Sequence, residues 1–438
     1  MSGISIKIPD DNVEERTYAI NTLFECFLHL EISETAACES ENTEISFGNG
    51  KIVIEDHFWK HHKKTLSYLD SSCLPAPRYI RNDFCPESDL PVIYGNGDII
   101  ITSDTITCGA DIFASAFFML ARWEEHCPTR RDRHGRFSAT ESVALKYGFL
   151  HRPVVNEYAE MLWNMMKFLG FDGDRPETSF QPVLTHDVDI LESNSRIKSA
   201  AGDILFRHNL KMAKSRFATR KDPADTFGFL MDQSEKNGLK STFFLMASDY
   251  REGKTGNYLG TRRFNKLIEE ITARGHGIGF HAGFGTSENR TACEKELEML
   301  RKATGCDVCL ARQHYLKIQI PQTLQILQSC GISTDCTLGY HDHEGFRCGT
   351  GNRFPTFDFL NRRTLDIHEL PLVIMDGTLK DSRKLSPDAS QEIIAGYFDL
   401  GRKYRMPVSI LFHNSSFDGY LWKGWKEIYT NVTDNLSQ

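Results

Sequence analysis

Hydrophobic and polar positions follow two different patterns along the chain. Up to about residue 175, helical and strand periodicities are mixed. The pattern predicts helices over residues 13–30, 110–126 and 154–170, and short strands over residues 44–48, 51–56 and 98–102. Turns rich in glycine and asparagine, such as FGNGK, separate the strands. This first part is typical of a small α+β module.

Beyond residue 180 the predicted strands alternate with helices. The strands are apolar and lie over residues 182–189, 240–247, 277–281, 308–316, 368–374 and 407–414; the helices lie over residues 262–275, 290–305, 321–331 and 388–404. This alternation predicts an α/β fold with a parallel sheet covered by helices. A polar, proline-bearing stretch over residues 171–182 precedes it. We therefore expect an N-terminal α+β domain over residues 1–175 and a second domain over residues 180–438.

The charge balance limits the classes of binding partner that the chain suits. The 438 residues include 51 Lys and Arg against 59 Asp and Glu, which gives a formal net charge of −8. Without a basic excess, nucleic acid and anionic membrane surfaces are poor partners. A small molecule or a neutral polymer suits the chain better, and homo-oligomerisation is compatible with the sequence.

The sequence also bears on the compartment. The N-terminus reaches acidic residues within ten positions and lacks the basic start and apolar core of a secretion signal. The longest apolar stretch, residues 110–121, is too short for a transmembrane segment. The 12 cysteines include no CxxC pair. These features predict a cytoplasmic protein without disulfides or membrane spans.

Acidic and basic side chains gather where the predicted strands end. Asp187 and Asp189 close the apolar run PVLTHDVDI, and the single residue between them places both on one strand face. Other predicted strands end in further residues of this kind: His281, Arg312, His314 and His413. Because the carboxyl ends of parallel strands meet at one edge of a sheet, we expect these side chains to converge. The competing interpretation is that strand-end carboxylates cap turns and that the histidines are satisfied core residues.

Carboxylate and imidazole groups suit a divalent transition metal, zinc in particular. A further carboxylate and imidazole would then serve as base and acid in a hydrolysis. One aspartate would accept the proton of the attacking water, and His413 would protonate the leaving group. Arg312 would keep the catalytic carboxylate ionised and oriented, because a neighbouring positive charge favours the charged form of a carboxylate.

Four motifs, THDVD, GHGIGFH, ARQHYL and ILFH, resemble in order and spacing those of the polysaccharide deacetylase superfamily over roughly residues 180–438. These metal-dependent enzymes remove N- or O-acetyl groups from sugars. More narrowly, the chain resembles bacterial members with an extra N-terminal domain, often linked to surface polysaccharide genes. The resemblance implies a distorted (β/α) barrel. It also implies individual roles: Asp187 as catalytic base, Asp189 and His281 as metal ligands, Arg312 as the orienting arginine and His413 as catalytic acid.

One ligand of the family pattern is missing. The superfamily has a second metal-binding histidine four residues after the first, where this chain has Gly285. Catalytic zinc sites generally have three protein ligands, so a replacement is needed. We expect His314, two residues past Arg312 and on the same strand face, to be that ligand. His341 and His343 are the alternatives.

The sequence therefore predicts a metal-dependent hydrolase that removes an acetyl group from an amino sugar of a surface glycan or its precursor. Two alternatives stay open. One is a degenerate deacetylase domain that binds glycan without hydrolysing it, which the glycine at position 285 suggests. The other is a hydrolase of a non-sugar amide, because one fold can serve both chemistries.

Other charged features fall outside the predicted site. The stretch RWEEHCPTRRDRHGRF, residues 122–137, is predicted to be a solvated helix end followed by a basic loop. Glu369 and Asp376 flank another strand, where buried salt bridges explain them as well as a pocket role does.

Overall fold

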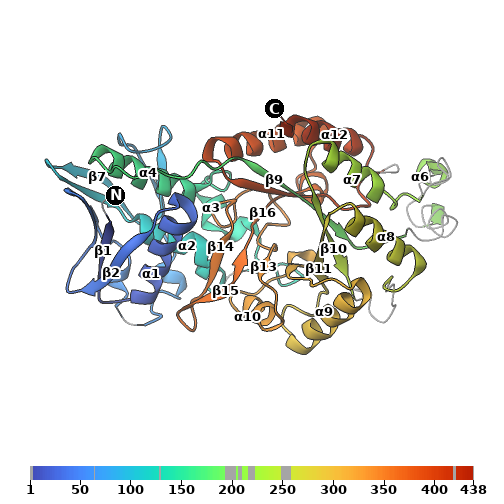
Figure 1. The fold of residues 1–438 in the computed structure, drawn as a ribbon, viewed down its shortest axis with the longest axis horizontal. Coiled ribbons are helices and arrows are strands. Elements are labelled where there is room, and N and C mark those ends of the chain that lie inside the picture. Colours follow the sequence, from blue (N-terminus) through green and yellow to red (C-terminus); the bar gives the residue numbers. More distant parts are fainter. Residues whose placement is uncertain are drawn as a thin grey trace.

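The computed structural model of the chain describes residues 3–63, 65–127, 130–192, 204–205, 210–215, 222–247, 258–417 and 421–437. Two large sheets dominate these residues. In Figure 1 the N-terminal sheet lies on the left, and the larger sheet with its helices lies on the right. Most of their buried apolar side chains belong to one hydrophobic core, in which the ring centres of Phe117 and Phe357 are 5.4 Å apart. Within the described ranges, no helix is both long and apolar enough to cross a membrane.

The first sheet is mixed, in the order β2-β1-β3-β4-β8-β7. Its strands are β1 (Ile4–Pro9), β2 (Ile32–Cys38), β3 (Thr43–Phe47), β4 (Gly50–Ile54), β7 (Gly95–Ile101) and β8 (Thr105–Ala110). A separate antiparallel pair consists of β5 (Arg78–Ile80) and β6 (Leu90–Val92). The helices of this part are α1 (Val13–Asn21), α2 (Ile112–Ala121), α3 (Val143–Lys146) and α4 (Val154–Phe168). The helix predicted over residues 13–30 is α1 continued by a π-helical segment, Thr22–Leu28.

The larger sheet has nine strands in the order β14-β15-β13-β12-β11-β10-β9-β17-β16. The strands are β9 (Gln181–Val188), β10 (Ser241–Met246), β11 (Gly277–Ala282), β12 (Leu310–Gln313), β13 (Thr334–Asp335), β14 (Phe354–Asp358), β15 (Arg363–Glu369), β16 (Leu372–Met375) and β17 (Pro407–Leu411). Every neighbouring pair is parallel except β14 with β15. The sheet curls, but β14 and β16 are its edges, so it forms an open, partial barrel.

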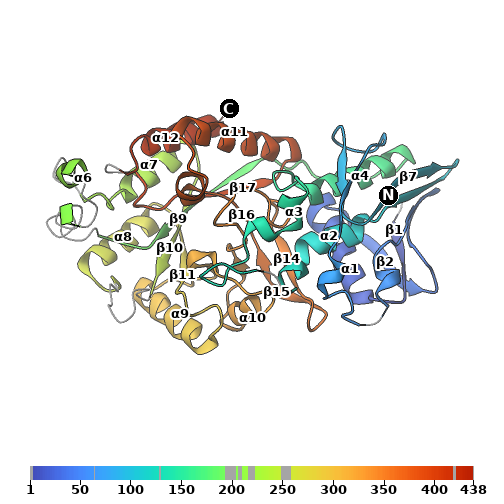
Figure 2. The same ribbon diagram turned by 180° about the vertical axis from the view of Figure 1, so that it is seen from behind.

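The helices of the second part are α6 (Leu210–Ser215), α7 (Phe227–Lys236), α8 (Arg262–Ala273), α9 (Arg290–Thr304), α10 (Gln322–Ser329), α11 (Pro387–Tyr404) and α12 (Trp425–Asp434). From α7 to α12 they lie around the outside of the curled sheet (Figures 1 and 2). Helix α8 shows why: Phe264, Leu267 and Ile271, spaced three and four residues apart, form its buried face. The Thr261 side chain accepts from the Phe264 N–H at 3.2 Å and caps its N-terminus.

One predicted strand is wrong in its extent. Residues 368–374 belong to two strands, because β15 ends at Glu369 and β16 begins at Leu372. Pro371 lies between them and has no N–H for a strand ladder. The two strands pair at different places in the sheet, β15 with β13 and β16 with β17. The antiparallel strand β14 was not predicted either.

The prediction of a solvated helix end at the start of residues 122–137 is also wrong. Arg122, Glu124 and Glu125 are buried. Glu125 accepts from Arg122 Nε at 3.0 Å and from Arg347 Nε at 2.9 Å. Buried charges are tolerated when they are paired, and here the second arginine comes from the other half of the chain. A pairing of this kind leaves no local signal in the sequence.

Candidate active site

Five parallel strands of the larger sheet end around one pocket of about 250 Å³. The residues that line it are Arg136, Asp187, Asp189, His281, His314, Tyr315, Leu316, Met375, Gly377 and His413. Five of the six predicted site residues are therefore brought together here. The sixth, Arg312, does not line the pocket but donates a hydrogen bond to Asp187, which does. The strand-end convergence follows from the shared direction of the strands.

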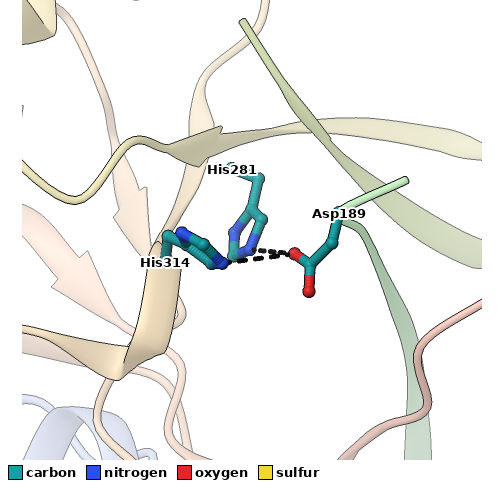
Figure 3. A group of neighbouring side chains, drawn as sticks. All are labelled: Asp189, His281 and His314. Carbon is teal, nitrogen blue, oxygen red and sulfur yellow. Dashed lines mark ion pairs between the residues drawn. The ribbon is translucent and has the colours of Figure 1, made fainter. Parts of the chain in front are cut away.

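Asp189, His281 and His314 present metal-ligand atoms to one another (Figure 3). Asp189 Oδ1 lies 3.2 Å from His281 Nε2 and 3.6 Å from His314 Nε2. One ligand atom of each residue lies within 4.8 Å of the other two. In the part of the chain that the structure describes, no other three His, Cys, Asp or Glu side chains meet this spacing.

These residues fit a zinc ion. Ligand atoms at zinc distances of about 2.0–2.1 Å around a tetrahedral ion lie roughly 3.3 Å apart. His281 Nδ1 lies 3.1 Å from the carbonyl O of Arg312, so Nδ1–H donates there and Nε2 turns its lone pair toward Asp189. A lone pair that faces a carboxylate requires a cation or a proton between the two.

The electrostatics of the two histidines agree with this fit. Burial disfavours a charge on His281, but Asp187 and Asp189 raise its pKa, so a metal ion bound here would take the place of a proton on Nε2. Burial, followed by the charge of His281, lowers the pKa of His314 to about 4. His314 is therefore neutral near pH 7, as a metal-binding imidazole must be.

The carboxylate of Asp189 completes the group. Burial opposes its ionisation, but a hydrogen bond from His281 and the charges of His413, His281 and His314 hold its pKa below the ordinary value. Its side chain is 37% exposed, so solvent screens part of this effect. Asp189 thus offers an ionised carboxylate to the pocket that it lines.

His314 reaches the group by a route that differs from the prediction. Strand β12 ends at Gln313, so His314 does not share a strand face with Arg312. It opens a 3₁₀ turn, His314–Leu316, in which Tyr315 and Leu316 have left-handed backbone with φ of 64° and 53°. The prediction of a shared strand face is therefore wrong, and a tight turn after the strand places this histidine.

Asp187 is a buried carboxylate beside the three ligands. Its Oδ2 lies 3.7 Å from His281 Nε2, and its Oδ1 accepts from Arg312 Nη1 at 2.9 Å. Arg312 is buried and also donates to Thr185 Oγ1 at 2.9 Å and to the Cys336 carbonyl at 2.8 Å. An arginine fixed by three acceptors sets the orientation of the carboxylate that it contacts.

His413 lies two residues after β17 and is held by Asp376. Its Nδ1 lies 2.8 Å from Asp376 Oδ1, and its backbone N–H donates to Asp376 Oδ2 at 2.7 Å. Burial disfavours the imidazolium, but the charges of Asp376, Asp189 and Asp187 raise the pKa of His413 to about 10. Because Nδ1 is hydrogen-bonded to Asp376, the proton that His413 can donate to another group is the one on Nε2. Nε2 lies 3.9 Å from Asp189 Oδ2.

The two alternative metal ligands, His341 and His343, lie beside other carboxylates and not beside Asp189. His341 Nε2 is 3.5 Å from Asp132, and His343 Nδ1 is 3.7 Å from Asp342. A Cβ added to Gly285 would meet no atom within 4 Å, so the residue is not required there for close packing.

Sequence reasoning gave no role to two residues of the site: Asp376, which holds His413, and Arg136, which lines the pocket. Asp376 directly follows β16, so the strand-end pattern that selected Asp187 could have selected it as well. Arg136 belongs to the first part of the chain. No periodicity or spacing connects it with the strand ends.

Comparison with family models concerns the first part of the chain. A family model described as a family of unknown function (DUF7033) matches residues 4–170. No curated protein matches the chain. The matched family covers the segment that contributes Arg136, but its description gives no activity.

Several solved structures are similar to the chain. A candidate polysaccharide deacetylase from Mycobacterium smegmatis is 14% identical, with 60% of this chain and 86% of that chain covered and a TM-score of 0.41. A family 4 carbohydrate esterase from Streptomyces lividans in complex with acetate is 11% identical, with 60% and 91% covered and a TM-score of 0.31. A CE4 family pseudoenzyme from Bacillus anthracis is 11% identical, with 59% and 62% covered and a TM-score of 0.31. These identities are low, so the function proposed below rests on the geometry of the site.

Proposed function

We propose that the protein is a metal-dependent hydrolase that removes an acetyl group from an amino sugar of a glycan or glycan precursor. The observation that carries the proposal is the arrangement of three units around one pocket: the Asp187–Arg312 pair, the Asp189–His281–His314 group and the Asp376–His413 pair. Acyl hydrolysis needs a base, an acid and a centre that polarises the carbonyl. The three units supply these functions.

Each side chain has a defined task. Asp189, His281 and His314 would hold the ion, which when bound supplies the positive charge that polarises the acyl carbonyl and acidifies water. Asp187, oriented by Arg312, accepts the proton of the attacking water at its carboxylate. His413 donates the proton on Nε2 to the leaving nitrogen, and its bond with Asp376 keeps that proton available near pH 7.

The pocket also restricts the substrate. At about 250 Å³ it is smaller than the roughly 300–1,000 Å³ of sites that enclose drug-sized ligands. It suits a short acyl group with at most one sugar ring, and the rest of a glycan would lie outside. Zinc as the ion, a cytoplasmic location and a homo-oligomeric state remain predictions from the sequence.

Metal analysis and acetate release test the proposal together. The purified protein is expected to contain or take up stoichiometric zinc or cobalt and to release acetate from N-acetylated amino sugars. Chelation should abolish the release, and added metal should restore it. Release from simple amides alone would instead indicate a non-sugar amidase. Metal-free protein that binds glycan without acetate release would support the degenerate binding domain.

Asp376→Asn is expected to move the alkaline limb of the pH–rate profile to lower pH. The Asp376 charge is the largest contribution that favours protonated His413, so its loss lowers the pKa of His413 from about 10. A general acid is active below its pKa, so kcat/KM should begin to fall at a lower pH than in the wild type. Acetate release measured from neutral to alkaline pH checks this. An alkaline limb at the wild-type position would show that His413 is not the acid.

A further inference from the structure

A hairpin from the first part of the chain packs against the turn that carries His314. The hairpin covers residues 131–137, with a β-bridge between Arg131 and Phe137. Gly135, at φ 77°, lies in its turn and donates its N–H to the Asp132 carbonyl at 2.9 Å. Left-handed backbone of this kind favours glycine, which explains why the chain can reverse at this point.

Two hairpin side chains contact Tyr315, the residue that follows His314. Arg136 Nη1 donates to the Tyr315 carbonyl O at 3.0 Å, and the Arg136 guanidinium carbon lies 5.9 Å from the Tyr315 ring centre. The ring centres of His134 and Tyr315 are 5.0 Å apart. The hairpin therefore contacts both the backbone and the ring of this residue.

Arg136 is itself fixed in place. Its Nε donates to Asp132 Oδ2 at 2.8 Å, and its backbone N–H donates to Asp132 Oδ1 at 2.9 Å. The guanidinium is thus directed by Asp132 on one side and by the Tyr315 carbonyl on the other. Since a carboxylate already neutralises Arg136, these contacts favour a role in holding the turn over the capture of a substrate anion.

The turn requires such support. Tyr315 and Leu316 are consecutive left-handed residues other than glycine, a conformation that persists only where the surroundings determine it. The other two ligands have firmer positions, because His281 lies within β11 and Asp189 directly follows β9. His314 is therefore the ligand whose position depends most on contacts from outside the larger sheet.

We propose that Arg136 is a positioning residue for the metal centre, acting through the Tyr315 carbonyl to fix the turn that presents His314. The first part of the chain thereby completes a site whose ligands all come from the second part. This inference rests on the metal site of the proposed function and deepens it by assigning residues 131–137 a role there.

Cobalt binding in the full-length protein tests the inference. Arg136→Ala is expected to weaken Co²⁺ binding by about 10–100-fold, the range found when an outer-shell partner of a metal ligand is lost. The visible spectrum of Co²⁺ bound to Arg136→Ala should shift toward the spectrum of Co²⁺ bound to His314→Ala. Arg136→Lys keeps a donor for the carbonyl and should be intermediate. Arg130→Ala removes an exposed arginine next to the hairpin and should match the wild type.

The outcomes separate the two proposals. Wild-type affinity and an unchanged spectrum in Arg136→Ala would overturn the inference and leave the proposed function standing. A wild-type protein that takes up no Co²⁺ would overturn both. If Arg136→Ala also lowers the melting temperature of the metal-free protein, Arg136→Lys decides: intermediate affinity supports the inference, and wild-type affinity overturns it.

Discussion

Asp187→Asn is expected to reduce acetate release by orders of magnitude and to leave metal binding almost intact. The amide keeps the shape of the carboxylate, and its Oδ1 can still accept from Arg312 Nη1, so the buried arginine retains a partner. It cannot accept the proton of the attacking water. General base catalysis typically contributes about 10²–10⁴-fold, so kcat should fall by a factor in that range. The three ligands, Asp189, His281 and His314, are unchanged.

Acetate release and elemental analysis on the same preparation check this result. Asp307→Asn is the matched control, because the Asp307 side chain is 94% exposed, and it should keep full activity and metal. Asp189→Asn should behave in the opposite way to Asp187→Asn and lose metal. Metal loss in Asp187→Asn together with metal retention in Asp189→Asn would exchange the two roles. Full activity in Asp187→Asn would exclude it as the base.

Much of the site could be predicted because its residues follow regular strands. Asp187 and His281 end apolar runs, and a parallel sheet brings such ends to one edge whatever their separation in the sequence. The strand register then determines which residues lie side by side on neighbouring strands: His281 pairs with Arg312, and Asp187 pairs with Phe244. Local pattern and a single topological rule were sufficient for this part of the site.

The rest of the site depends on turns and long-range contacts that the hydrophobic periodicity of the sequence does not predict. The left-handed backbone of Tyr315 directs His314 toward the ligands, and nothing in ARQHYL marks that turn because neither residue is glycine. Arg136 reaches the same turn from 179 positions earlier in the chain. The Glu125–Arg347 pair is likewise long-range. Contacts between distant segments are set by packing, so charges that looked solvated in the sequence are buried or line the pocket.

The overall architecture shows the same division. Alternating strands and helices correctly indicated a largely parallel α/β sheet. The prediction treated residues 368–374 as one strand, whereas Pro371 divides them and β15 and β16 lie in different parts of the sheet. Strand β14 pairs antiparallel with β15 and forms one edge of the sheet, and β16 forms the other edge. The sheet therefore does not close into a barrel. The six predicted site residues lie on, or within two residues of, strands β9, β11, β12 and β17, which were predicted, so these errors did not displace them.

His314→Ala is expected to weaken metal binding by more than about 100-fold, the upper end of the cost of losing an outer-shell partner, because a direct ligand is removed. Two protein ligands would remain where catalytic zinc sites generally have three. Acetate release should fall in parallel and should recover partly at high metal concentration, since Asp187 and His413 are untouched. Co²⁺ titration with and without substrate measures both effects.

The matched controls are the two rival histidines. His341→Ala and His343→Ala remove imidazoles that pair with Asp132 and Asp342, so both should bind Co²⁺ like the wild type. Metal loss in either variant, combined with retention in His314→Ala, would move the third ligand into the segment around residue 342. The left-handed turn at Tyr315 would then have no role in metal binding. The position of this one ligand therefore decides whether the site has the third protein ligand that catalytic zinc sites generally have.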